Sequence, residues 1–123
     1  MKKILITRRL LRSCEDKAKE TFEANFNLND ELYSQKKVIE VSAGQDGILS
    51  SLTDKVDEDT INNLPDSIKI ISNFAVGFGN IDLEAARNRG IAVTNTPDVL
   101  TDATAEIGVL LILGACRRAA EGI

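Results

Sequence analysis

Short, mostly apolar segments alternate along this chain with longer segments of helical periodicity, and this alternation limits the folds open to it. A strand that is apolar on both sides must be buried on both sides, whereas a strand with one solvated face would alternate apolar and polar residues. The pattern therefore predicts an α/β fold with a flavodoxin-like, doubly wound parallel sheet. The predicted strands are residues 3–7, 47–50, 68–72 and 91–94.

Helix start and stop signals fill the stretches between these strands. Ser13 and Asp82 stand where N-cap residues are expected, Pro65 terminates one helix, and Gly90 is placed as a left-handed stop. Residues 26–33 are ambiguous, because polar side chains interrupt what would be a weak strand. The predicted helices are residues 14–24, 35–41 and 57–63, followed by a helix between Asp82 and Gly90.

Composition indicates one globular domain without a surface for nucleic acid. The 123 residues are 43% hydrophobic and 28% charged, which is typical of neither disordered nor fibrous proteins. The net charge is -4, and the basic residues are dispersed except near the start of the chain. There, Arg8, Arg9 and Arg12 are interpreted as a solvated loop after the first strand, with an anion site as the alternative.

The apolar segments are too short for a signal peptide or a membrane span. The apolar stretch Ile4-Leu5-Ile6 ends within a few residues, at Arg8. The longest run of small or apolar residues, 107–116, has only ten residues. Cys14 and Cys116 have no Cys or His partner nearby, so we expect reduced, partly buried thiols. We therefore expect a cytoplasmic protein that makes no membrane contact.

The turn Gly77-Phe78-Gly79 follows a predicted strand and resembles part of a dinucleotide fingerprint. The third glycine of that fingerprint would stand at position 82, which is Asp82, and no acidic residue ends the following strand. The turn is therefore not predicted to bind a cofactor pyrophosphate. Two interpretations remain: a tight turn that needs unusual φ angles, or an anion site in which the Val76 and Gly77 amides hold a carboxylate.

Two segments of the chain resemble one enzyme family. The segment from Phe74 to Asp82 is similar to the substrate loop of the D-2-hydroxyacid dehydrogenases, although similar enzymes often carry an acid at the position of Gly79. The segment from Asn95 to Glu106 resembles their first interdomain helix. Within it, the run from Asp98 to Glu106, followed by Cys116-Arg117-Arg118, is most similar to the glyoxylate and hydroxypyruvate reductase branch.

The resemblance implies roles for five residues. Val76 and Gly77 are implied to supply backbone amides to the carboxylate of the substrate. Leu52 and Thr53 lie in a loop that leans over the substrate in similar enzymes, with an ordinary βα loop as the alternative. Thr104 is implied to lie near the cofactor, with an ordinary first-turn helix threonine as the alternative. No residue is expected to bind a metal.

The resemblance also implies a domain division and a reaction. Residues 1–98 would form the substrate domain, and 99–123 would be the interdomain helix that begins a nucleotide-binding domain. The implied reaction is hydride transfer between NAD or NADP and a small 2-keto acid such as glyoxylate or hydroxypyruvate, with a histidine as acid and base. The chain contains no histidine and no GxGxxG, so we expect residues 1–123 to be inactive alone and to bind no cofactor tightly. The alternative is a non-catalytic module that binds small carboxylates or dimerises.

The helix predicted from Thr101 to Ala119 is apolar around its whole circumference. Such a helix requires burial on more than one side. Each buried Leu or Ile side chain contributes roughly 1.5–3 kcal/mol, so leaving several exposed is costly for a domain of marginal stability. We therefore expect a homodimer or higher oligomer assembled through this helix.

Overall fold

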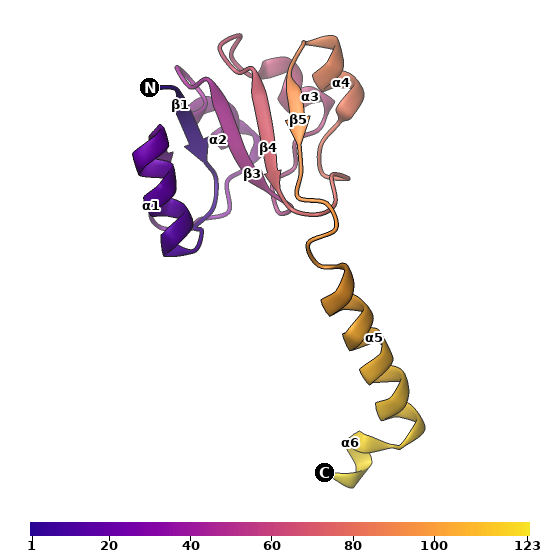
Figure 1. Cartoon of the computed structure of the whole chain (residues 1–123). Helices are drawn as coiled ribbons and strands as arrows, with labels where there is room; N and C mark the ends of the chain where they lie inside the picture. The colour runs from indigo at the N-terminus through magenta and orange to yellow at the C-terminus, as the bar shows by residue number, and fades with distance from the viewer.

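The protein is built on one five-stranded parallel sheet. The computed structural model describes all of residues 1–123, and the strands follow the order β2-β1-β3-β4-β5 (Figure 1). Every neighbouring pair is parallel. This is the strand order of the flavodoxin-like doubly wound sheet, so the predicted fold class is confirmed. The strands are β1 (Lys3–Ile6), β2 (Glu23–Phe26), β3 (Gly47–Ser51), β4 (Ile70–Phe74) and β5 (Ala92–Thr94).

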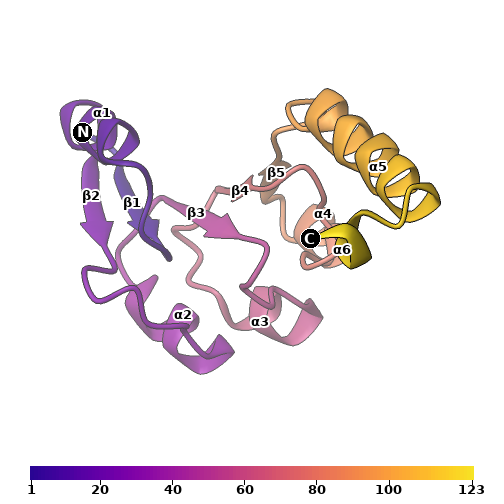
Figure 2. The ribbon, with the colours of Figure 1, turned by 90° about the horizontal axis from the view of Figure 1, so that it is seen from below.

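Four helices connect the strands and cover the two faces unequally. Helix α1 lies on one face beside β1 and β2, while α2 and α3 lie on the other (Figure 2). Because only α1 occupies its face, Ile70 and Phe74 of β4 remain 38% and 51% exposed. Coverage of both faces, which the apolar strands predicted, is therefore incomplete. The connecting helices are α1 (Arg12–Thr21), α2 (Gln35–Val41), α3 (Glu58–Asn63) and α4 (Leu83–Asn88).

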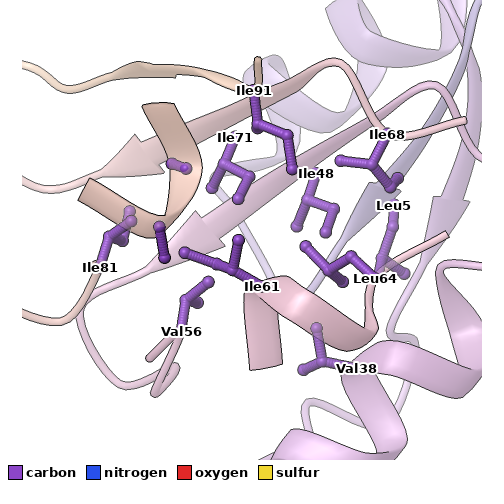
Figure 3. Packing of buried hydrophobic residues seen from close by; sticks show 12 residues of the cluster. Leu5, Val38, Ile48, Val56, Ile61, Leu64, Ile68, Ile71, Ile81 and Ile91 are labelled. Carbon is purple, nitrogen blue, oxygen red and sulfur yellow. The ribbon is translucent and has the colours of Figure 1, made fainter. Parts of the chain in front are cut away.

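The hydrophobic core lies between the sheet and the helices α2, α3 and α4 (Figure 3). Ile71 of β4 and Ile61 of α3 are completely buried there. Aliphatic side chains fill the cluster without a buried aromatic ring. Since the carboxyl ends of the strands extend past this core, the loops after β3 and β4 are left free to form a site.

Two predicted signals, the cap at Asp82 and the stop at Gly90, are confirmed, and the structure adds a third signal, a cap at Asp57. The Asp57 side chain accepts from the Thr60 amide at 3.0 Å and caps α3, and the Asp82 side chain accepts from the Ala85 amide at 2.9 Å and caps α4. Gly90 ends α4 with φ of +67°. These signals succeed because each involves residues at most a few positions apart.

The structure also differs from the sequence expectations at several points. Helix α1 begins at Arg12 without a side-chain cap, so Ser13 is not the N-cap. Strand β2 occupies residues 23–26, so the helix predicted at 14–24 ends earlier, at Thr21, and the weak strand predicted at 26–33 shares only Phe26 with β2. The side chains of β2 alternate between exposed and half-buried, which is the period of a strand and not of a helix. Cys14 and Cys116 are both exposed, so the expectation of partly buried thiols is wrong.

Helix α5 (Thr101–Cys116) leaves the carboxyl edge of the sheet and projects away from it (Figure 1). It ends before the predicted Ala119, because Arg118 adopts a left-handed conformation with φ of +51° and starts a short helix, α6 (Ala119–Gly122). No residue of α5 is buried. Neither α5 nor any other helix combines the length and hydropathy that crossing a membrane requires.

Candidate functional site

A pocket of about 530 Å³ opens where β3 and β4 end, at the carboxyl edge of the sheet. Ligands of doubly wound folds bind at this edge. Three of the residues predicted to bind substrate, Leu52, Val76 and Gly77, come together in its wall. None of the side chains that line the pocket is charged. The lining residues are Leu52, Phe74, Ala75, Val76, Gly77, Gly79, Asn80, Thr96, Val99 and Leu100.

The backbone amides of Val76 and Gly77 donate to no atom of the protein. Gly77 is exposed and Val76 is half-buried, so both are within reach of a bound molecule. Adjacent backbone amides that have no acceptor form a local anion site without a basic side chain. The pocket therefore offers hydrogen-bond donors suited to a carboxylate.

The two glycines of this turn do not adopt the φ angles that require glycine. Neither Gly77 nor Gly79 has a positive φ, and a Cβ added at either position would meet no atom of the protein within 4 Å. The interpretation as a turn that depends on unusual φ angles is therefore wrong. What the missing side chains do provide is an open approach to the backbone, which favours the anion interpretation.

The side chains of Asn73, which is buried, and Asn80, which is half-buried, connect the pocket loop to the neighbouring strands. Asn73 donates to the Gly77 carbonyl at 3.0 Å, and Asn80 donates to the Ser51 and Asp54 carbonyls at 3.1 and 2.9 Å. The two asparagines also bind each other, at 3.0 Å. This network fixes the loops after β3 and β4 relative to each other. Sequence analysis did not find it, although the adjacent polar residues Ser72 and Asn73, near the end of a strand that is apolar elsewhere, were a signal.

Thr53 does not line the pocket. Its hydroxyl accepts from Arg8 at 2.9 Å, and Arg8 also forms a two-point contact with Asp30 at 2.8 and 3.2 Å. The hydrogen bonds from the Arg8 guanidinium and from the Arg9 amide lower the pKa of Asp30 to about 2. Thr53 thus lies one residue from the pocket wall, on the side of the loop that faces β1.

The arginines that follow β1 are engaged by carboxylates of the protein itself. Arg8 pairs with Asp30, and Arg9 binds Glu15 at 2.7 and 3.0 Å. The hydrogen bond from Arg9 lowers the pKa of Glu15, and that from Glu15 raises the pKa of Arg9. Arg12 is almost fully exposed. The arrangement agrees with a loop held by ion pairs, and the anion-site alternative gains no support.

Thr104 lies away from the pocket, exposed in the first turn of α5, where its amide donates to the Leu100 carbonyl at 2.9 Å. The glycine turn does not fit the pyrophosphate of a nicotinamide dinucleotide. The N-terminus of the helix after the glycine turn is capped by Asp82, and that carboxylate would repel a pyrophosphate. No group of three or more acidic or cysteine side chains is arranged to hold a metal ion either.

The sequence of this chain is similar to known proteins over most of its length. The profile of the D-isomer specific 2-hydroxyacid dehydrogenase catalytic domain matches residues 4–118. Glycerate dehydrogenase from Hyphomicrobium methylovorum is 40% identical over 121 residues, which is 98% of this chain and 38% of that enzyme. Glyoxylate reductase from Pyrococcus furiosus is 36% identical over 120 residues, 98% of this chain and 35% of that enzyme. The chain thus spans little more than a third of the length of these relatives.

Solved structures show the same fold. A crystal structure from Polaromonas sp. JS6 66, described as a D-isomer specific 2-hydroxyacid dehydrogenase, superposes with a TM-score of 0.87 at 34% identity. The match covers 99% of this chain and 38% of that one. Glyoxylate reductase from Paecilomyes thermophila has a TM-score of 0.81 at 26% identity. The profile match over residues 4–118 and the 40% identity to glycerate dehydrogenase show that the chain belongs to the D-isomer specific 2-hydroxyacid dehydrogenase family, as part of its catalytic domain.

Proposed function

We propose that this chain binds the carboxylate of a small 2-keto or 2-hydroxy acid, of the glyoxylate and hydroxypyruvate type, on the backbone amides of Val76 and Gly77. The observation that carries the proposal is the pair of amides without acceptors in the wall of a pocket that has no charged side chain. Leu52 stands in the opposite loop, where it would cover the bound acid. The names of two relatives, glycerate dehydrogenase and glyoxylate reductase, support this class of ligand.

The expected affinity is low. A hydrogen bond to a charged group contributes about 1.5–3 kcal/mol, and immobilising a small ligand offsets part of what two such bonds provide. We therefore expect a dissociation constant on the order of 1 mM for a two-carbon acid. The net charge of -4 lowers the affinity for anions further, so binding depends on the local amides.

In this proposal, residues 1–98 are the substrate-binding part of an NAD(P)-dependent reductase, and 99–123 begin its nucleotide-binding part. Enzymes of this family use NAD(P), whose reduced form supplies the hydride when a 2-keto acid is reduced. Residues 1–123 would bind and orient the acid without reducing it, since they contain neither a histidine to move a proton nor a cradle for the nucleotide. A non-catalytic carboxylate-binding module is the alternative, and it shares the same site.

Replacement of Gly77 by alanine tests the site. The added methyl has open space in the fold, so stability should change little, but it would stand beside the amide and keep a carboxylate away. We expect the dissociation constant of glycolate to rise roughly tenfold, as loss of one charged hydrogen bond requires. The measurement is an NMR titration that follows the Val76 and Gly77 amide signals, with the uncharged analogue glycolamide as the reference ligand.

Gly108→Ala is the control, because it also adds a methyl with open space but lies in α5, outside the pocket. This variant should bind glycolate as the original chain does. The proposal would be wrong if both variants bound glycolate equally weakly. It would also be wrong if the Val76 and Gly77 amide signals responded equally to glycolate and glycolamide, because the pocket would then hold its ligand without the amide pair.

We also propose that α5 is buried against a second copy of this chain. Its apolar side chains are between 56% and 67% exposed, all the way round the helix. A helix of 16 residues is about 24 Å long, long enough for about two heptads of contact with an equivalent helix. Packing two such helices together covers at least one face of each and forms a symmetric interface.

A further inference from the structure

We infer that Asn95 is a positioning residue of the carboxylate site, because its side chain sets the direction of the Gly77 amide. This inference rests on the proposed function and concerns how the site is built. Asn95 does not line the pocket. Its Nδ2 atom donates to the Val76 carbonyl at 2.7 Å, across a separation of 19 residues.

A peptide unit is planar and trans, so its carbonyl and its amide N–H point in opposite directions. The Val76 carbonyl and the Gly77 amide belong to one such unit. When Asn95 holds the carbonyl, it also holds the N–H on the opposite side. Without this contact, the unit could rotate and present its carbonyl oxygen to the ligand, which would repel a carboxylate.

The neighbouring peptide units are held in the same way but by other groups. Three consecutive carbonyls of the loop accept hydrogen bonds, and the three amides that share their peptide units, those of Val76, Gly77 and Phe78, have no acceptor in the protein. The three contacts are Thr96 amide to Ala75 carbonyl at 3.0 Å, Asn95 side chain to Val76 carbonyl at 2.7 Å, and Asn73 side chain to Gly77 carbonyl at 3.0 Å.

Of these contacts, the one from Asn95 can be removed with the least damage. The Thr96 contact is made by the backbone, and Asn73 is 2% exposed and holds other parts of the fold. Asn95 is half-buried, and no other hydrogen bond of its side chain is present. A substitution here therefore frees one peptide unit, the one that carries the Gly77 amide, and leaves that of Val76 in place.

The test is the variant Asn95→Leu, which has a similar shape but no donor. In an NMR titration of the full 123-residue chain with glycolate, we expect the Gly77 amide signal to lose its response while the Val76 signal keeps it. The dissociation constant should rise roughly tenfold. Thr94→Val is the control: at the position directly before Asn95, it removes an exposed hydrogen bond to Ser72 and should leave both responses unchanged.

The outcomes separate the two proposals. If neither amide of the original chain responds to glycolate, the proposed function is wrong, and the role of Asn95 with it. If the original chain responds and Asn95→Leu shows the same Gly77 response and affinity, only the role of Asn95 is wrong. Should Asn95→Leu unfold, Asn95→Ser gives the same test, because its shorter side chain does not reach the Val76 carbonyl; an unchanged Gly77 response there would equally overturn the inference.

Discussion

Single side chains join loops of this protein that the sheet alone does not connect. Asp30 is the clearest case, because it follows β2 and yet binds both Arg8 and the Arg9 amide after β1. It does so with φ of +52°, a conformation that aspartate and asparagine tolerate better than most residues. The carboxylate is therefore the link between two loops at the carboxyl edge of the sheet.

This link should be lost in acid. The pKa of Asp30 is lowered from 3.8 to about 2, so its charged form stabilises the fold above pH 4, and this contribution disappears as the pH falls from about 4 to about 2. Asp30→Asn should lower the urea midpoint at pH 7 and flatten the decline of that midpoint between pH 4 and 2.5. Asp98→Asn is the matched control, since Asp98 also has a positive φ but makes no ion pair or hydrogen bond. Parallel pH curves for Asp30→Asn and the original chain would contradict the expectation.

At the scale of elements, α5 is the part of the chain least supported by its surroundings. It contains Gly108 and Gly114, each of which costs a helix about 1 kcal/mol relative to alanine. A helix of this length is marginal in water unless its apolar face is packed. Because no residue of α5 is buried within one copy, its stability should depend on association.

Two charges on α5 should therefore separate the copies. Leu110 and Leu113 lie one turn apart and line the same apolar depression, so the double substitution of both by lysine places charge in the expected interface. Light scattering should find a dimer or larger species for the original chain at tens of micromolar and a monomer for this variant. Leu32→Lys, at a position equally exposed but outside α5, should not change the mass. A strictly monomeric original chain would exclude association through α5.

For the whole molecule, the expected behaviour is binding without turnover. Hydride transfer to a 2-keto acid needs a bound nicotinamide and a proton donor near neutral pH, and the pocket of this chain contains neither a titratable side chain nor a nucleotide cradle. We expect residues 1–123 to oxidise no NADH above the buffer background with glyoxylate or hydroxypyruvate, even at millimolar substrate. A rate that scales with protein concentration and is lost in Gly77→Ala would show this expectation to be wrong.

The amino-acid sequence by itself determined the parallel sheet, the cap at Asp82 and the stop at Gly90. These depend on periodicity and on contacts between residues a few positions apart, which a linear pattern records. The sequence also predicted Val76, Gly77 and Leu52 as substrate-binding residues, on the basis of the resemblance to a family and not of a physical argument alone. Their roles stay predictions.

Only the tertiary structure decided how the pocket is held. The Asn95 contact with Val76 and the Asn80 contact with Ser51 join residues 19 and 29 positions apart, and nothing in the local pattern says which carbonyl an asparagine will meet. The same holds for the partners of Arg8 and for the exposure of α5. Long-range polar contacts form where the packed sheet brings chain segments together, so their geometry exists only once the fold does.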